Sequence, residues 1–281
     1  MKKILTALKA DAALVSKKLT EIFTKTDPDI SVLFDSMRYS AIETAGKRVR
    51  PFLTLEFSRA LGGSDEKALP LAAAIEMVHT YSLIHDDLPC MDDDDERRGM
   101  PSNHKVFGEA TALLAGDGLL TLAFSVIASS EALGDEAKIK AIRLLADSAG
   151  VFGMIGGQQM DLIGEREKLT EDRHKKMNLL KTGALIKAAA LMGCIAANAD
   201  ASAYKAASDY AENVGLAFQV KDDLLDNGEE DEKTTYLTFM SEDEAAALVS
   251  SLTEKAIAAV SVIPNSDILI EAAEFLRDRT V

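Results

Sequence analysis

Two clusters of carboxylates, far apart in the chain, are the residues whose types and spacing could do chemistry. The first aspartate box is Asp86-Asp87-Leu-Pro-Cys-Met-Asp92, and it continues as Asp93-Asp94-Asp95-Glu96-Arg97-Arg98. The second aspartate box is Asp222-Asp223-Leu-Leu-Asp226. Clustered carboxylates repel one another, and burying them beside apolar segments is costly unless cations compensate. With Lys and Arg around both boxes, the pattern predicts a site for several Mg²⁺ ions and a polyphosphate.

The local geometry of each box indicates how its carboxylates could meet. Asp86 ends an apolar helical run that Pro89 interrupts, and Asp92 can fold back beside it if Pro89-Cys90 forms a bulge. Asp222 and Asp226 are four residues apart and share one helix face. If the two helices pack antiparallel, these four aspartates converge on one cavity. Each box alone could equally be a solvated acidic surface, whereas both together favour the metal site.

The elements that must position these boxes are helices. Only six prolines interrupt long stretches rich in Ala, Leu, Glu and Lys, with apolar residues three and four apart. We expect Pro51 in the first turn of its helix. Without an alternating strand pattern or a polar linker, residues 1–281 are predicted to form one all-α domain, a bundle of about ten or more helices around a central cavity. The predicted helices span 2–25, 30–45, 49–61, 66–88, 109–131, 135–155, 172–197, 202–227, 241–261 and 265–278.

The composition bounds the partners and the compartment. A net charge of −15 and an isoelectric point near 4.8 argue against nucleic acid or an anionic membrane. Cys90 and Cys194 lack zinc-site spacing and are expected to be reduced thiols in the cytoplasm. No signal peptide and no window of about 18 uncharged apolar residues is found, so we expect no membrane span. Helices 109–131 and 182–197 are apolar on most of their circumference, which is typical of a buried helix or a homodimer interface.

A long, ordered set of motifs resembles the trans-isoprenyl diphosphate synthases, and within them the bacterial farnesyl diphosphate synthases. Before the first box these motifs are Gly46-Lys47-Arg48-Val49-Arg50-Pro51 and His79-Thr-Tyr-Ser-Leu-Ile-His85-Asp86. After it they are Asn103-His104-Lys105, Gly108-Glu109-Ala110, Leu114-Ala-Gly-Asp117, Gly156-Gly157-Gln158, Lys181-Thr182-Gly183 and Phe218-Gln219-Val-Lys-Asp222-Asp223. The resemblance implies the all-α class I isoprenoid synthase fold and Mg²⁺, with three ions expected.

The resemblance also implies a role for each matching residue. Mg²⁺ ligands are expected to be Asp86, Asp92, Asp222 and Asp226, and the residues that carry catalysis are expected to be Asp86, Asp92, Arg97, Lys181 and Asp222. The allylic diphosphate is expected at Arg97, Lys181, Thr182, Gln219 and Lys233, and isopentenyl diphosphate at Lys47, Arg50, His79 and Arg98. Arg presents a planar fork of donors to phosphate oxygens, and Lys presents a mobile point charge. Gln158 and Asp161 receive no role, because Gly156-Gly157 could equally be a packing kink.

The expected reaction is a head-to-tail prenyl transfer to isopentenyl diphosphate, which needs no protein nucleophile. The product is expected to grow down from the first box between helices. Tyr81, five residues before Asp86, lies about 7.5 Å further along the helix axis, followed by the small Ser82. With the Pro89-Cys90 insertion, an aromatic residue here resembles the pattern of fifteen-carbon producers, so we expect dimethylallyl or geranyl diphosphate to be extended to farnesyl diphosphate.

One segment departs from the family, and several alternatives remain open. The stretch from Asp226 to Tyr236 is short and very acidic, and Lys233 is its least securely matched residue. The sequence does not decide whether Arg277 and Arg279 approach the site. A geranylgeranyl or other short-chain synthase is one alternative. A class I terpene cyclase would carry a different second metal motif, and a non-catalytic regulatory subunit would tend to lose the ligands.

Overall fold

The computed structural model describes residues 2–44, 46–225 and 234–279, and these are almost wholly helical. The α-helices are α1 (Lys2–Ile22), α2 (Ser31–Arg38), α3 (Val49–Ala60), α4 (Asp65–Asp86), α5 (Asn103–Phe107), α6 (Glu109–Ala128), α7 (Asp135–Ala149), α8 (Met154–Gly164), α9 (Glu171–Asn178), α10 (Ala184–Ala196), α11 (Ala201–Leu225), α12 (Glu242–Val260) and α13 (Asp267–Asp278). The predicted all-α class is confirmed, and the single-domain extent stays a prediction.

Short elements connect these helices at points that matter for the site. π-helical turns at Tyr39–Glu43 and Leu179–Gly183 continue α2 and join α9 to α10. 3₁₀ turns lie at Pro28–Ile30 and Tyr236–Thr238. The strands β1 (Glu96–Arg97) and β2 (Met100–Pro101) form a hairpin that the sequence did not predict.

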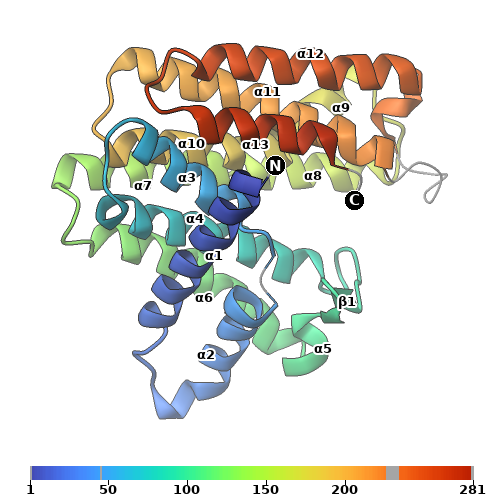
Figure 1. Ribbon diagram of the computed structural model, residues 1–281. Helices are drawn as coiled ribbons and strands as arrows, with labels where there is room; N and C mark the ends of the chain where they lie inside the picture. Colours follow the sequence, from blue (N-terminus) through green and yellow to red (C-terminus); the bar gives the residue numbers. More distant parts are fainter. Residues whose placement is uncertain (1, 45, 226–233, 280–281) are drawn as a thin grey trace.

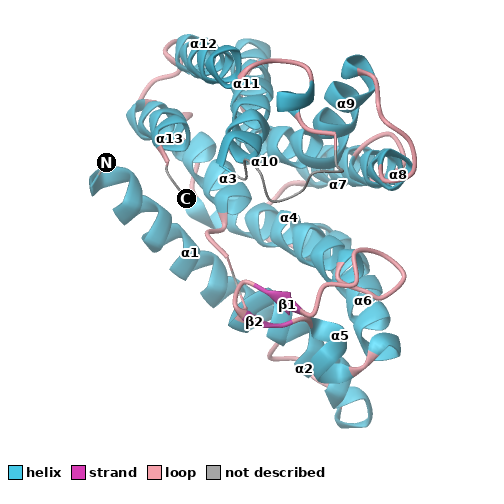
Figure 2. Ribbon diagram, turned by 90° about the vertical axis from the view of Figure 1, so that its right-hand side faces the viewer, coloured by secondary structure: helices cyan, strands magenta, loops and turns pink. Residues whose placement is uncertain are grey.

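The central helix is α4, because it carries buried apolar residues on nearly every face. It packs against α3, α6 and α10. Figure 1 shows α11, α12 and α13 as a layer above α3 and α10, with α2 and α6 on the opposite side of the bundle. Figure 2, turned by 90°, shows α4 and α6 side by side below α10. The two aspartate boxes lie at the carboxyl ends of α4 and α11, and both helices pack against α10.

One predicted helix was wrong, and two helices were missed wholly or in part. The stretch 135–155 is not one helix, because α7 ends at Ala149 and α8 begins at Met154. Gly150 adopts an extended conformation (φ −74°, ψ −164°) that ends α7. The short helix α5 and all of α8 beyond residue 155 were also missed. Pro51 does lie in the first turn of α3, as predicted.

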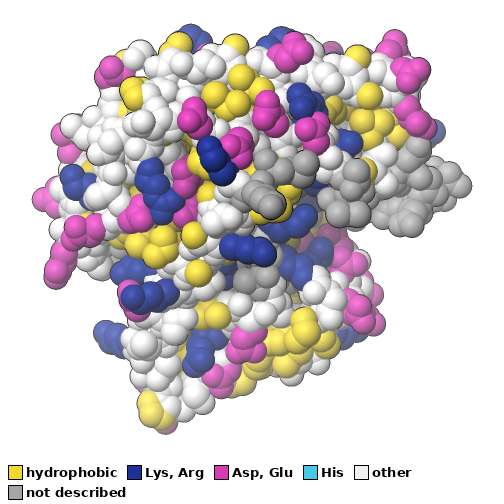
Figure 3. All heavy atoms as spheres, in the orientation of Figure 1, with side chains coloured by type: hydrophobic (Ala, Val, Ile, Leu, Met, Phe, Trp, Pro, Cys, Tyr) yellow, Lys and Arg dark blue, Asp and Glu magenta, His cyan; other side chains and the backbone are white. Residues whose placement is uncertain are grey.

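The surface in Figure 3 has a hollow near the middle of one face, and Lys and Arg side chains gather around it. A protein with an overall charge of −15 therefore concentrates positive charge in one place. Local concentration of this kind attracts an anion even when the whole molecule is acidic.

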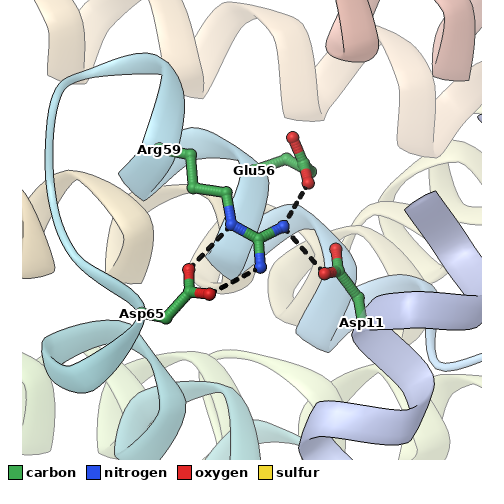
Figure 4. Close-up of polar contacts among 4 residues, drawn as sticks. All are labelled: Asp11, Glu56, Arg59 and Asp65. Carbon is green, nitrogen blue, oxygen red and sulfur yellow. Dashed lines mark hydrogen bonds and ion pairs between the residues drawn. The ribbon is translucent and has the colours of Figure 1, made fainter.

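Arg59 joins the N-terminal helix to the centre of the bundle (Figure 4). Its guanidinium donates to Asp11 of α1 at 2.7 Å, to Glu56 of α3 at 2.5 Å and, through two bonds, to Asp65 of α4 at 2.7 and 2.9 Å. Asp11 is buried, and burial raises the pKa of its carboxyl to about 7. The network therefore fixes α1 against α3 and α4.

Two helical stretches, Glu109–Ala128 and Glu171–Ala196, are long and apolar enough to cross a membrane by length and composition alone. Each contains charged residues, including Asp117 in the first and Lys187 in the second. Core helices of water-soluble proteins pass the same test, so two such stretches are weak evidence for a span. The more apolar window of α6 is only 33% buried in the chain.

Candidate active site

The first aspartate box folds back on itself as the sequence predicted. Asp86 is the last residue of α4, and the backbone N–H of Asp92 donates to the carbonyl oxygen of Asp86 at 2.8 Å. The bonds from the N–H of Met91 and of Asp93 to the carbonyl of Leu88 close the intervening turn. The pKa of Asp86 is raised to about 6: burial is the largest cause, Asp92 and Asp87 act in the same direction, and Lys181 and Arg97 oppose the shift. A carboxyl group with this environment is stabilised by an added cation.

A tight hairpin places Arg97 and Arg98 beside this box. Arg98 and Gly99 both have positive φ (58° and 75°), the conformation that a two-residue hairpin turn requires. Arg97 donates to Asp87 at 2.9 and 2.5 Å and to Asp94 at 2.6 Å. Arg98 donates to the carbonyl of Thr44 at 3.1 Å and lies against Gly46, where a Cβ would come within 2.5 Å of the Arg98 Cζ. The hairpin thus places two guanidinium groups in the lining of the larger cavity, which is described next.

The larger cavity, of about 940 Å³, brings together the four residues predicted for isopentenyl diphosphate. Lys47, Arg50, His79 and Arg98 all line it. Arg50 is half-buried, burial lowers the pKa of its guanidinium, and its buried Nε has no hydrogen-bond partner within the described part of the chain. Burial and the surrounding arginines hold the pKa of His79 well below 6.5, so this imidazole is neutral. A buried guanidinium with an unused donor is arranged to accept an anionic ligand.

Glu76 is the counter-charge that the sequence analysis missed in this cavity. Its carboxylate accepts from Arg48 Nη1 at 3.0 Å, and both side chains are 2% exposed. Arg48 has a positive φ of 52° and also donates to the carbonyl of Ala41 at 2.5 Å. The signal was available, since Glu76 precedes His79 by three residues on α4 and helical residues at this spacing share a face.

The π-helical turn between α9 and α10 carries Lys181 and Thr182 into the site. Lys181 Nζ donates to Asp161 of α8 at 2.5 Å. The turn and α8 approach so closely at Gly157 that a Cβ there would lie 2.1 Å from the Lys181 backbone nitrogen. Gly157 is therefore required for this packing. Asp161 contacts Lys181, which is predicted to bind the allylic diphosphate, although the sequence analysis gave Asp161 no role. π-helical turns are often found at functional sites.

A second cavity, of about 560 Å³, adjoins the first through shared lining residues, among them Arg50, His79 and Thr182. Asp86 and Lys181 line it, and its other lining residues include Leu120, Met154, Ile155 and Leu162. Tyr81 and Ser82 also line it. The Tyr81 ring is packed edge-on against His85 at 5.7 Å, and its hydroxyl is buried without a partner among the described residues.

The second aspartate box divides its carboxylates between two directions. Asp222 lines the larger cavity together with Gln219 and Thr182. Asp223 instead accepts from the backbone N–H of Tyr236 at 2.6 Å, which anchors the 3₁₀ turn at Tyr236–Thr238 to the end of α11. Asp226 and Lys233, both predicted site residues, lie outside the described residues.

The donor set fits a hard divalent cation. Carboxylate oxygens are the ligands that Mg²⁺ takes, usually one or two of them with waters and phosphate oxygens. Among the described residues, one group of three potential ligand atoms lies within 4.8 Å of one another, and it comprises Asp93, Asp95 and His104. Asp86, Asp92 and Asp222 are therefore more widely spread than a compact protein cage. That spacing suits ions that share their ligands with a bound diphosphate.

Comparison with known proteins agrees with this geometry. The polyprenyl synthetase family model matches residues 31–261. The farnesyl diphosphate synthase of Micrococcus luteus is 39% identical over 272 residues, 92% of this chain and 93% of that protein. The geranylgeranyl diphosphate synthase of Cyanophora paradoxa is 38% identical over 292 residues, 98% of this chain and 96% of that protein. A crystal structure described as an FPP/GFPP synthase from Zymomonas mobilis superimposes with a TM-score of 0.92 at 35% identity, and covers 98% of this chain and 99% of that chain. This chain is a prenyltransferase and belongs to the polyprenyl synthetase family.

Proposed function

We propose that this enzyme condenses dimethylallyl or geranyl diphosphate with isopentenyl diphosphate, in a Mg²⁺-dependent reaction that yields farnesyl diphosphate and pyrophosphate. One observation carries the proposal: a cationic cavity lined by Lys47, Arg50 and Arg98 adjoins a second cavity that is lined by Asp86, Lys181 and apolar side chains. The first cavity suits a diphosphate without an attached metal cluster. The second suits a diphosphate with its hydrocarbon chain.

The proposed metal ligands are Asp86, Asp92, Asp222 and Asp226. When bound, Mg²⁺ neutralises the allylic diphosphate and stabilises pyrophosphate as the leaving group. Arg97 and Lys181 supply fixed positive charge toward the same leaving group, with Thr182, Gln219 and Lys233 as further contacts. Asp87 and Asp94 hold Arg97, and Asp161 holds Lys181, so neither cation needs to be reordered at the moment of reaction.

The bond changes balance without a protein nucleophile. The allylic carbon–oxygen bond breaks and leaves an allylic cation, which the double bond of isopentenyl diphosphate attacks to form the new carbon–carbon bond. A proton then leaves for the departing pyrophosphate. Side chains such as Leu120, Met154 and Leu162 exclude water that would otherwise quench the cation.

A neutral His79 supports the assignment of the isopentenyl diphosphate end. Four arginines, Arg48, Arg50, Arg97 and Arg98, lower its pKa, and a fifth positive charge on the imidazole would add repulsion that the structure avoids. The neutral ring still offers one donor to a phosphate oxygen. Lys47, Arg50 and Arg98 then supply positive charge to the diphosphate, and His79 orients it through a hydrogen bond.

The test is to incubate the purified chain with dimethylallyl and isopentenyl diphosphates, with Mg²⁺ or with excess EDTA, and to size the products. We expect a fifteen-carbon diphosphate that requires Mg²⁺. A twenty-carbon product would replace the farnesyl assignment with the geranylgeranyl alternative. Absence of any elongated product from folded protein would contradict the proposal.

We also propose that the enzyme acts as a homodimer in the cytoplasm. Support comes from α6, whose Leu113 and Leu114 are 47% and 56% exposed in the single chain. A second copy would cover such apolar surface. Sedimentation of the wild type and of Leu114→Glu checks this, with a dimer expected for the first and a monomer for the second; two monomers would contradict it.

A further inference from the structure

Arg279, one residue beyond α13, reaches back to the second aspartate box. Its Nη2 donates to Oδ1 of Asp222, and also to the carbonyl of Phe218 at 3.2 Å. The guanidinium carbon lies 4.1 Å from the centre of the Phe218 ring, a cation–π arrangement. With only 11% of its side chain exposed, Arg279 is a built-in part of the larger cavity wall rather than a surface residue.

Arg279 occupies the carboxylate oxygen that a metal ion would need. Mg²⁺ binds carboxylate oxygens at about 2.0–2.1 Å. An ion at that distance from Asp222 Oδ1 would lie close to the guanidinium bonded to the same atom, and the two positive charges would repel strongly in a partly buried site. The two cations therefore cannot both keep their preferred geometry on this oxygen.

The Arg279 side chain is held by hydrogen bonds through its Nη2, but not all of its donors have partners. Its Nε is buried and has no hydrogen-bond partner within the described part of the chain. A buried donor without an acceptor raises the free energy of the bound position. Withdrawal of Arg279, one residue beyond α13, breaks its two hydrogen bonds and its contact with the Phe218 ring, and it returns the Nε to solvent.

We propose that Arg279 and a divalent cation compete for Asp222, so that metal binding at the second box requires the end of α13 to withdraw. This inference rests on the proposed function, because it takes Asp222 as a metal ligand. It makes the carboxyl-terminal end of the chain a regulator of metal affinity. Binding of metal and release of Arg279 are then one coupled event.

The test measures metal affinity directly. Calorimetric titration of Mg²⁺ into protein without substrate compares the wild type with Arg279→Gln and with Arg277→Gln. Arg277 is the matched control, since it lies two residues before Arg279, in the last turn of α13, has the same charge and bonds to Asp278 rather than to the site. We expect Arg279→Gln to bind Mg²⁺ about tenfold more tightly, which corresponds to about 1.4 kcal/mol, and Arg277→Gln to match the wild type.

Asp222→Asn separates failure of this inference from failure of the proposed function. If Asp222→Asn weakens Mg²⁺ binding but Arg279→Gln leaves it unchanged, the competition is refuted and the metal site stands. If Asp222→Asn binds Mg²⁺ as well as the wild type, the metal assignment of Asp222 fails, and the inference fails with it.

A second measurement follows Arg279 itself. Limited trypsin digestion with mass spectrometry reports cleavage after Arg279 and after Arg277 in the same wild-type sample. Saturating Mg²⁺ should increase cleavage after Arg279, because the released side chain can enter the protease, and should leave cleavage after Arg277 unchanged. Equal cleavage after Arg279 with and without Mg²⁺ would overturn the proposal.

Discussion

Replacement of Tyr81 by Ala should lengthen the product by one five-carbon unit. Tyr81 precedes Asp86 by five residues within α4, which corresponds to about 7.5 Å along the helix axis. Both residues line the cavity of about 560 Å³. One helical turn, about 5.4 Å, is similar to the length of one isoprenoid unit. Loss of the ring therefore opens space for about one more condensation, and we expect geranylgeranyl diphosphate in place of farnesyl diphosphate.

The substitution also has a cost in stability that the structure bounds. Tyr81 is 5% exposed, and truncating a buried aromatic residue to Ala costs about 3–5 kcal/mol. The variant should remain folded, because an ordinary domain has about 5–15 kcal/mol of stability. Thermal unfolding is measured beside product length, so that a misfolded variant is not mistaken for an inactive one.

Tyr81→Phe is the matched control. The hydroxyl of Tyr81 is buried and has no hydrogen-bond partner among the described residues, so its removal leaves the ring and the cavity floor in place. We expect unchanged product length and equal or slightly higher stability, since removing an unsatisfied buried polar group is favourable. If a folded Tyr81→Ala enzyme still made a fifteen-carbon product, the idea that the Tyr81 ring limits chain length would be refuted. A longer product from Tyr81→Phe would refute it as well.

Three further predictions concern charge. Glu76→Gln should destabilise the fold by about 3–5 kcal/mol in urea unfolding, because it leaves Arg48 buried without its partner charge; a loss below about 1 kcal/mol would contradict a buried ion pair. The folded-state pKa of Asp11 is about 7 against an ordinary value of 3.8, so the folded state binds the proton more tightly and the contribution of Asp11 to stability falls as pH rises between these values. The melting temperature of the wild type should accordingly drop between pH 5 and pH 8 relative to Asp11→Asn, and parallel curves would argue against the shift. Removing divalent cations with EDTA should abolish product formation while leaving the helical circular dichroism spectrum unchanged, since the described core is built from side-chain packing; loss of helicity would indicate a structural metal.

Much of the fold could be predicted because helical periodicity is a local property of the sequence. Apolar residues three and four apart identify a helix before any tertiary contact is known. The folding back of Asp92 onto Asp86 was also predictable, since Pro89 ends the helix within the same short segment. The break between α7 and α8 was missed because apolar spacing continues across Gly150 and hides the change of direction.

The sequence by itself determined the helical class, the two aspartate boxes and the set of basic residues that surround them. Only the tertiary structure decided which charges pair: Arg48 with Glu76, Lys181 with Asp161, and Arg279 with Asp222. These partners are 28, 20 and 57 residues apart, so no local spacing rule connects them. The physical reason is that an ion pair forms where helix packing brings two side chains together, and packing depends on the whole apolar core. The boxes and the basic residues can therefore be recognised in the sequence, whereas the ion pairs that these side chains form are seen only in the folded structure.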